Sequence, residues 1–349
     1  MNIGRVAYFI YSLITKKNGY FYIGGFPKIN NLGDQSLFLA YKKILGQDLI
    51  HFQGGRIQTF IAKVFKVEHT KAFLAGGTLI NRLGLFSLRD AFKVFNKIYV
   101  IGTGVAQNYF WSTQSGFINE TSEWMEALKK ASYLSVRGPL GKNLLEENGV
   151  SEVEIFGDPV ITFALPEKRV VTNKKVIGIN VGVSKDAAWV SEEVIFKLYY
   201  DLVTKLLHSN WEIHWLVVCD SDLQITKKVA SETKTEQFIH VFFNDPSKYI
   251  QLCQEMCVFI GLKLHSVVLA HCAYTPSIML EYRPKCLDYM LSIGEDDNCF
   301  RLDKINAEQI FARICELFEN QDQFIVRLYE NINMMKKNQA KQINKLLSS

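Results

Sequence analysis

The chain has 349 residues, of which 48% are hydrophobic and 13% aromatic, and its formal net charge at pH 7 is +5. A chain of this length and composition can bury a large core, which excludes a mainly disordered protein and favours two α/β domains over one. The 40 basic residues are balanced by 35 acidic ones without a long basic tract. This argues against nucleic acid as a partner and for small anionic substrates or an acidic membrane surface.

The first apolar run of the chain extends from Val6 to Ile14. Nine residues are too few to cross a bilayer, and no small-residue cleavage site follows them. We therefore predict a first core helix or strand. The alternative is a segment that touches a membrane surface, flanked by Lys16 and Lys17. Both interpretations predict a cytoplasmic protein, in the second case peripheral at the inner face of the membrane.

Short apolar runs then alternate with longer amphipathic runs, as strands and crossover helices do in parallel sheets. Helices in the first half include Gln35–Leu45 and Glu123–Lys130. The predicted strands there are Tyr20–Gly24, Ala72–Gly76, Ile98–Gly102, Tyr133–Val136 and Val153–Phe156.

A polar, charged stretch at Ala164–Lys175 marks a domain boundary. We expect an N-terminal domain at residues 1–168, a C-terminal domain at 169–320 and an amphipathic packing helix at 321–349. Predicted elements after the boundary are strands Val176–Val181, Ile213–Cys219, Val258–Gly261 and Ser277–Leu280, and helices Glu192–Leu207, Ser247–Gln254 and Ser266–Ala273. The expected fold is α/β, with two doubly wound Rossmann-like domains that face a central cleft, as in glycosyltransferases of the B type.

Cysteine usage argues against disulfides and metals. All seven cysteines lie between Cys219 and Cys315, an odd number with no pairs across the first half. Cys253 and Cys257 form a C-x-x-x-C pair, but no second pair or histidine cluster accompanies them at ligand spacing. We expect reduced thiols, no metal and no cofactor.

Turn residues follow the early strands. Asn31-Leu32-Gly33-Asp34 precedes a helix, so Asp34 is either an ordinary capping residue or a catalytic one. Gly76 and Gly77, and later Gly102-Thr103-Gly104, follow strands as tight turns or as points where a ligand approaches the backbone.

Arg137 stands at the carboxyl end of a predicted strand. A guanidinium there belongs either to a structural ion pair or to a fork that binds a carboxylate or phosphate. The sequence alone leaves both interpretations open.

The densest group of ionisable residues lies late in the chain. Lys263-Leu264-His265-Ser266 follows an apolar run, and Arg283 and Lys285 follow the next one. If the strand extends to His265, alternation places Lys263 and His265 on one side while Leu264 faces the core. His271, further along the same helix, is expected to pack inside.

These motifs resemble those of the polysaccharide pyruvyl transferase family, which shows an early N-x-G-D, a middle S-x-R-D, a late R-L-H, and then P and Y-x-x-K. The chain has Asn31-Leu32-Gly33-Asp34, Ser135-Val136-Arg137-Gly138, Lys263-Leu264-His265, and Pro276 with Tyr282-Arg283-Pro284-Lys285. The resemblance spans about residues 20 to 295. Two positions depart from the family pattern: Lys263 replaces an arginine and Gly138 replaces an aspartate.

The resemblance implies phosphoenolpyruvate as donor and a sugar acceptor in a surface polysaccharide or its lipid-linked precursor. The C-terminal domain would hold phosphoenolpyruvate, with Arg137, Lys263, Arg283 and Lys285 as its cations. His265 would protonate the methylene carbon, and Asp34, on the opposite domain, would orient or deprotonate an acceptor hydroxyl. The remaining substrate-binding candidates are Asn31, Gly33, Gly76, Gly77, Leu264 and Ser266.

Two rival functions share these residues. One is a nucleotide-sugar-dependent glycosyltransferase of the same architecture, in which the late cations would hold a diphosphate. The other is a non-catalytic carbohydrate-binding relative, which the departures at Lys263 and Gly138 would suggest.

Overall fold

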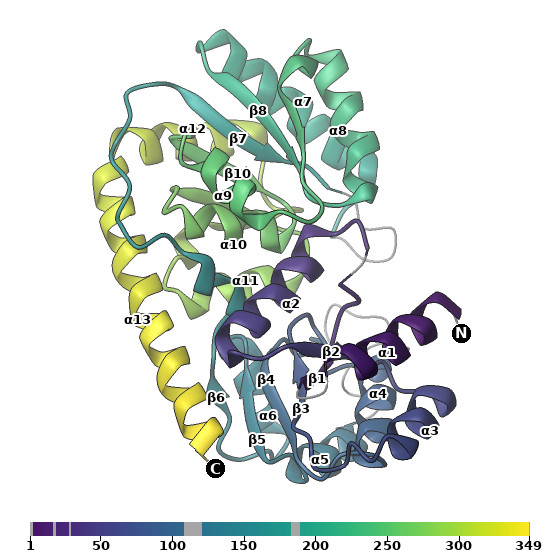
Figure 1. Ribbon diagram of the computed structural model, residues 1–349. Coiled ribbons are helices and arrows are strands. Elements are labelled where there is room, and N and C mark those ends of the chain that lie inside the picture. Colours follow the sequence, from purple (N-terminus) through teal and green to yellow (C-terminus); the bar gives the residue numbers. More distant parts are fainter. Residues whose placement is uncertain (1–2, 17–18, 28, 108–120, 183–188, 349) are drawn as a thin grey trace. The chain divides into compact units, whose positions relative to one another are not determined.

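The computed structural model describes residues 3–16, 19–27, 29–107, 121–182 and 189–348 (Figure 1). They form two six-stranded sheets in which all neighbouring strands run parallel. The chain divides into two compact units. Unit 1 comprises Met1–Pro27, Leu37–Pro159 and Lys337–Ser349, and unit 2 comprises Lys28–Ser36 and Val160–Lys336.

The sheet of unit 1 has the strand order β2-β1-β3-β4-β5-β6. The strands are β1 (Tyr20–Ile23), β2 (Leu49–His51), β3 (Ala72–Ala75), β4 (Ile98–Thr103), β5 (Tyr133–Val136) and β6 (Glu154–Ile155). The helices are α1 (Ile3–Thr15), α3 (Arg56–Val64), α4 (Arg82–Phe92), α5 (Thr121–Lys129) and α6 (Pro139–Glu147). Side chains from these five helices share one core with one face of the sheet, and α2 (Leu32–Leu45) and the end of α13 (Gln321–Ser348) cover the other.

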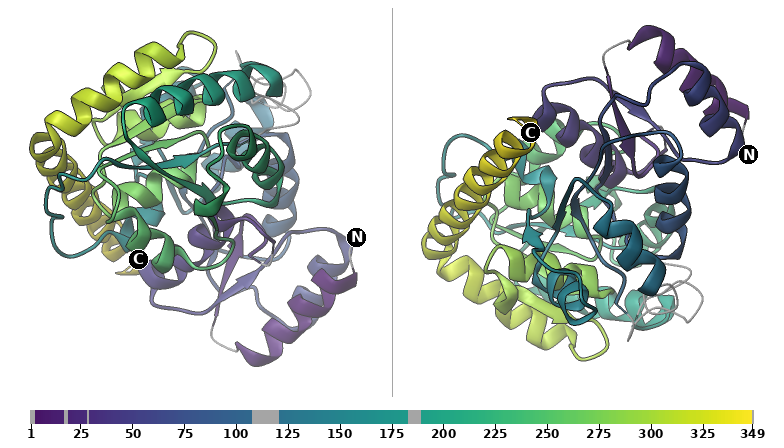
Figure 2. Two further views of the ribbon diagram at one scale, coloured as in Figure 1. Left: turned by 90° about the horizontal axis from the view of Figure 1, so that it is seen from above. Right: turned by 90° about the horizontal axis from the view of Figure 1, so that it is seen from below.

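The sheet of unit 2 has the order β12-β11-β10-β7-β8-β9. Its strands are β7 (Val176–Asn180), β8 (Glu212–Val217), β9 (Ile239–Val241), β10 (Val258–Gly261), β11 (Ser277–Glu281) and β12 (Cys299–Arg301). Its helices are α7 (Glu192–His208), α8 (Asp220–Glu232), α9 (Pro246–Cys253), α10 (Leu264–Cys272), α11 (Pro284–Ser292) and α12 (Ala307–Glu319). Short 3₁₀ turns occupy η2 (Pro159–Phe163), η3 (Glu236–Phe238) and η4 (Asp296–Asn298). Figure 2 gives two further views of the ribbon.

The sequence explains these elements locally. Strands β3, β4, β7, β10 and β11 are buried along their whole length, as continuous apolar runs in two-sided parallel sheets are. Polar residues start the helices: Asn306 and Gln309 form a reciprocal capping box at α12. The predicted α/β fold of two doubly wound domains is therefore confirmed.

The N-terminal run belongs to helix α1, whose Phe9 and Leu13 are buried in the core of unit 1. One side of the Val6–Ile14 run is thus a core helix, as predicted, whereas Tyr11 and Ile14 on its other side are exposed. Lys17 lies outside the described residues. Within the described part of the chain, no helix combines the length and the apolarity needed to cross a membrane.

The compact units differ from the expected domains of 1–168, 169–320 and 321–349. The segment 28–36 groups with unit 2 although it precedes most of unit 1 in sequence. Helix α13 is divided between the two units at Lys336. Its last part contacts β6, where Gln342 Nε2 donates to the carbonyl of Ile155 at 2.9 Å. The physical reason is that backbone hydrogen bonds and buried faces, not sequence order, decide which segments pack together.

Candidate functional site

The carboxyl edge of the unit 2 sheet has a topological switch point between β10 and β7. The chain starts at β7 and leaves it in both directions, to β8 and β9 on one side and to β10, β11 and β12 on the other. In open parallel sheets ligands bind outside the strand ends at such a point. Gly182, which follows β7, and Lys263, which follows β10, meet there: a Cβ added to Gly182 would lie 2.5 Å from Lys263 Cε.

Two successive strand-turn-helix units bring four basic side chains to this edge. Strand β10 ends at Gly261 and α10 begins at Leu264, and the adjacent β11 and α11 repeat the pattern. Lys263 and Arg283 occupy the position before each helix, in extended backbone. His265 and Lys285 take the second helical position. First-turn amides and the helix dipole favour an anion at both helix starts.

Strand β10 does not extend to His265, so the condition for strand alternation between Lys263 and His265 is not met. The Lys263 amide donates to Asn180 Oδ1 at 3.0 Å, which takes the chain out of the β ladder, and the helix begins one residue later. Ser266 is buried, and its hydroxyl donates to the carbonyl of Lys263 at 2.6 Å, so it closes the turn. Leu264 is buried in the core, as predicted.

Three of the cations surround one aromatic ring. The ring centroid of Tyr282 lies 5.8 Å from Lys263 Nζ, 5.4 Å from Arg283 Cζ and 5.1 Å from Lys285 Nζ. These distances are within the range of cation–π attraction. Tyr282 is buried, and burial raises the pKa of its phenol to about 12. The ring therefore stays neutral at physiological pH and holds the three cations within a small volume.

Lys263 is also anchored by a carboxylate that the motifs did not include. Asp222, on the first turn of α8, is fully buried, and its Oδ1 lies 3.3 Å from Lys263 Nζ. Burial raises the pKa of Asp222, and the neighbouring ammonium acts in the opposite direction. The contact with Asp222 therefore fixes the Lys263 ammonium at the switch point. Without it, the long lysine side chain would be mobile.

Asp34 lies beside His265 in the same unit. Asn31 caps α2, with Oδ1 accepting from the Gly33 amide at 2.9 Å and from the Asp34 amide at 3.3 Å. The Leu32 amide donates to the carbonyl of Val218 at 2.8 Å and ties this turn to unit 2. A Cβ added to Gly33 would lie 2.5 Å from His265 Nδ1, so only glycine leaves room for the imidazole.

The Asp34 carboxyl interacts electrostatically with His265 and Lys285. Burial raises the pKa of the Asp34 carboxyl, while His265 and Lys285 lower it. His265 as a whole is half-buried, and its Nε2 atom is buried. The expectation that Asp34 acts from the opposite domain is wrong, because residues 28–36 group with unit 2.

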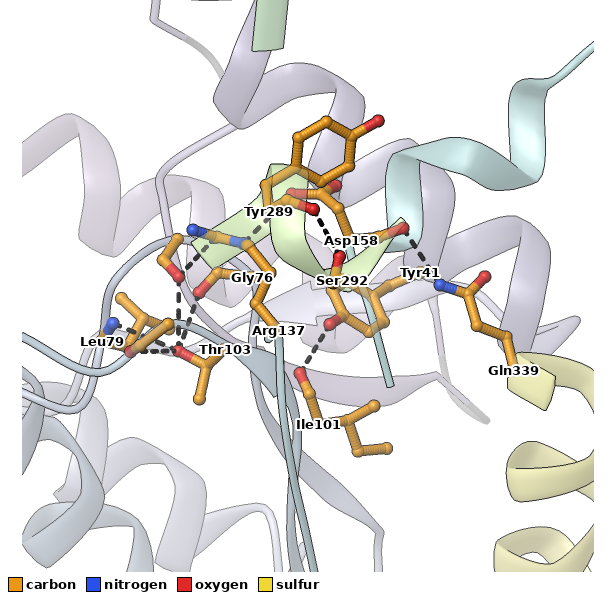
Figure 3. Close-up of polar contacts among 12 residues, drawn as sticks. Tyr41, Gly76, Leu79, Ile101, Thr103, Arg137, Asp158, Tyr289, Ser292 and Gln339 are labelled. Carbon is orange, nitrogen blue, oxygen red and sulfur yellow. Dashed lines mark hydrogen bonds and ion pairs between the residues drawn. The ribbon is translucent and has the colours of Figure 1, made fainter. Parts of the chain in front are cut away.

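Arg137 lies in a sealed ion pair of unit 1 (Figure 3). Its side chain is fully buried, with Nε 3.2 Å from Asp158 Oδ2 and Nη2 donating to the carbonyl of Gly77 at 2.7 Å. Gly76 and Gly77 both have positive φ, of 73° and 63°, so they form a tight turn that needs glycine. Of the two interpretations of Arg137, the geometry supports the structural ion pair.

Sequence reasoning missed three residues of these arrangements: Asp222, Asp158 and the ring of Tyr282 as a centre for the cations. Asp158 follows Gly157 at the end of a short strand and precedes Pro159, a pattern typical of strand-end turns. Asp222 has no such signal, because sheet order rather than sequence places it beside Lys263.

The model of the family described as polysaccharide pyruvyl transferase matches residues 11–284. The chain belongs to the polysaccharide pyruvyl transferase family. This confirms the resemblance drawn from the motifs and makes a transferase of polysaccharide biosynthesis the general class of the protein. No curated protein matches the chain in sequence.

Solved structures share the fold at low sequence identity. A glycosyltransferase from Rickettsia africae ESF-5 aligns with a TM-score of 0.56 at 15% identity, over 95% of this chain and 99% of that one. A putative UDP-N-acetylglucosamine 2-epimerase from Listeria monocytogenes has a TM-score of 0.58 at 9% identity, over 90% of this chain and 91% of that one. These similarities establish a GT-B architecture of two Rossmann-like domains.

Proposed function

We propose that this family member transfers the enolpyruvyl group of phosphoenolpyruvate to two hydroxyls of one sugar, forming a pyruvate ketal and releasing phosphate. The acceptor is a saccharide of a surface polysaccharide or of its lipid-linked precursor. The observation that carries the proposal is the gathering of Lys263, Arg283 and Lys285 around Tyr282, next to His265 and two helix starts.

Donor binding follows from the charges. Phosphoenolpyruvate carries a phosphate and a carboxylate on three carbons, so a site for it needs several cations in a small volume. Three cations around one ring meet this need, and first-turn amides of α10 and α11 add hydrogen-bond donors for the anionic oxygens, in α11 from Lys285 onward because Pro284 has no N–H. Arg137 is left out of this donor set, because its guanidinium is buried in a pair with Asp158.

His265 is the candidate general acid. Transfer of its proton to the methylene carbon converts that carbon to a methyl group and makes C2 electrophilic, and one sugar hydroxyl then adds to C2. The bond between C2 and the phosphate oxygen breaks, and the second hydroxyl closes the ketal ring. Of the two hydroxyl protons, one restores the imidazolium and the other leaves with hydrogen phosphate, so the reaction is balanced.

Asp34 has a different role from the one that the motifs suggested. Its carboxyl lies on the same turn as Gly33, against which the His265 ring packs. A carboxylate beside an imidazole orients the ring and stabilises its charged form. We therefore assign Asp34 to positioning His265.

A nucleotide-sugar-dependent glycosyltransferase is the second candidate, because a diphosphate suits the same cations and helix starts. One experiment separates the two. The full-length protein is incubated with a panel of saccharides and either phosphoenolpyruvate or UDP-sugars, and products are followed by mass spectrometry and phosphate release. We expect pyruvylated saccharide and free phosphate in the reactions with phosphoenolpyruvate, and no product in those with UDP-sugars. Sugar transfer from a UDP-sugar, without reaction of phosphoenolpyruvate, would contradict it.

A further inference from the structure

Three helices of unit 1 carry apolar side chains on both sides. On α3, Gln58 and Ala62 face the core, whereas Phe60 is 68% exposed. On α4, Leu85 and Leu88 are buried, whereas Leu83 is 75% exposed. The outward-facing apolar side chains of α1, α3 and α4 are Tyr11, Ile14, Ile57, Phe60, Val64, Leu83 and Phe86. Surface helices normally turn polar residues outward, so this second apolar stripe requires an explanation.

The three stripes belong to one surface. Phe9 of α1, Ala62 of α3 and Leu88 of α4 share one hydrophobic core on the same face of the sheet. Helix α1 packs beside α3, and the Gly55 amide before α3 donates to Asp90 Oδ2 of α4 at 2.7 Å. Figure 1 shows the three helices next to one another at the lower right. Their outward sides form what we call the α1–α3–α4 face.

Cations accompany the apolar side chains on this face. Arg56, Lys63 and Lys66 lie on or just after α3, and all three are exposed. Residues 54–67 contain no Asp or Glu, and neither do residues 1–33. Asp90 of α4 lies in an ion pair with Lys93, and Glu123 of α5 lies in one with Arg89. The face therefore has a positive charge of its own.

The exposed aromatic residues are concentrated here. In the described part of the chain, the exposed phenylalanines are Phe60, Phe65 and Phe86, and all three belong to α3, its end or α4. In unit 2, the exposed apolar residues include Val170 and Val171 before β7, Met334 on α13, and Val194, Tyr200 and Leu207 on α7, none of them a phenylalanine. Scattered exposed apolar residues are normal, but a group of them bordered by basic residues is not.

We propose that the α1–α3–α4 face docks on the surface of a bilayer that contains anionic lipids. Aromatic and aliphatic side chains enter the boundary between headgroups and acyl chains, and the surrounding lysines and arginines pair with lipid phosphates. A second copy of the chain fits less well, because self-association would bring the cations of two identical faces together. The inference does not rest on the proposed reaction, since lipid binding needs no substrate.

The test is co-sedimentation of the full-length protein with vesicles, without substrate. Phosphatidylglycerol–phosphatidylethanolamine vesicles are compared with phosphatidylcholine vesicles at low ionic strength. The variants I57S/F60S and L83S/F86S are compared with V170S/M334S, a matched pair of exposed apolar residues in unit 2, and circular dichroism checks their folding. We expect binding to the anionic vesicles to fall about tenfold or more in both face variants, and to be unchanged in the control.

The charge contribution is tested with K63E/K66E. This variant should lose binding to anionic vesicles and show a weaker dependence on salt. Three results would overturn the proposal: no sedimentation of the wild-type protein with anionic vesicles, equal binding by I57S/F60S, or a lipid-free dimer in analytical ultracentrifugation that F60S dissociates.

Discussion

The carboxyl edges of the two sheets carry similar residues in different settings. In unit 1 Arg137 follows β5, and in unit 2 Lys263 follows β10. Arg137 is fully buried, and its guanidinium holds Asp158 and the turn at Gly77. Lys263 is half-buried, with Asp222 behind it and His265 and Lys285 at neighbouring helix starts.

A cation at the end of a strand therefore does not by itself make a binding site. A buried ion pair stabilises its surroundings only while both partners are present. A cation at an accessible helix start, anchored from behind, keeps its outward side for an anion. We therefore expect changes in unit 1 to affect mainly stability and changes in unit 2 to affect mainly turnover.

The largest expected effect is at His265. H265Q should lower turnover by about 10²- to 10⁴-fold, as loss of a general acid does, while the free energy of unfolding changes little. H69Q, at an exposed histidine outside the site, is the control. Steady-state assays with phosphoenolpyruvate and denaturant titrations measure the two quantities. Turnover of H265Q at the wild-type rate would remove His265 from the mechanism.

Substitution of Arg137 should lower the free energy of unfolding strongly and turnover only weakly. R137M removes the guanidinium beside the buried Asp158 carboxylate, so we expect the free energy of unfolding to fall by about 3–5 kcal/mol. The double variant R137M/D158N should recover part of this loss. At a temperature where R137M is folded, its turnover should stay within about tenfold of wild type. A stable R137M protein with a loss of turnover as large as that of H265Q would contradict the comparison.

Lys263 tests the donor site with a smaller effect. K263M should raise the KM for phosphoenolpyruvate by about 10- to 100-fold, the equivalent of one charge-assisted contact. K263R restores the arginine of the family motif and should retain activity. D222N should also raise this KM, because the Lys263 ammonium loses the carboxylate that positions it. The increase in KM caused by D222N should be smaller in the K263R protein than in the wild-type protein. K248M, at an exposed lysine on α9, should leave KM unchanged.

Gly33 sharpens the comparison within unit 2. G33A introduces a methyl group where the His265 ring now packs, so the imidazole must move by a few tenths of an ångström or more. We expect kcat to fall about tenfold, with a change in unfolding free energy below about 1 kcal/mol. Gly46, whose added Cβ would meet no atom within 4 Å but which has positive φ, gives a control for backbone strain. A G33A enzyme with unchanged kcat would separate Gly33 from His265.

The histidines provide the smallest effect, as a dependence of stability on pH. Burial lowers the pKa of His271 to about 3 and that of His51 to about 4. The unfolded chain therefore binds protons that the folded chain does not, and stability falls as pH decreases below about 6.5. At pH 5.5 each buried histidine should cost about 1.4 kcal/mol relative to neutral pH. Urea unfolding of wild type and H271Q at pH 7.5 and pH 5.5 should show that H271Q loses less stability on acidification.

Sequence patterns predicted the buried strands better than the sheet edges. Val258–Gly261 and Tyr133–Val136 were predicted with their observed bounds, because continuous apolar runs mark strands covered on both faces. Of the four edge strands, Leu49–His51, Ile239–Val241 and Cys299–Arg301 were missed, whereas Glu154–Ile155 was predicted within Val153–Phe156. Three residues are too few to show a period.

At the site, the sequence identified the residues that follow strands but not their grouping. Lys263, His265, Arg283 and Lys285 were found because both strand-turn-helix units are local. The place of Asp34 in unit 2 depends on the hydrogen bond between the Leu32 amide and the carbonyl of Val218, which no local pattern encodes. The same holds for Asp222, since contacts between distant segments decide its neighbours.

We expect the unit 2 edge, and not Arg137, to bind the donor. Isothermal titration calorimetry of the full-length protein with phosphoenolpyruvate tests it most directly, with wild type, R137M and K263M/R283M compared at one ionic strength. We expect R137M to bind with an affinity close to that of wild type and K263M/R283M not to bind. Binding retained by K263M/R283M and lost by R137M would contradict it.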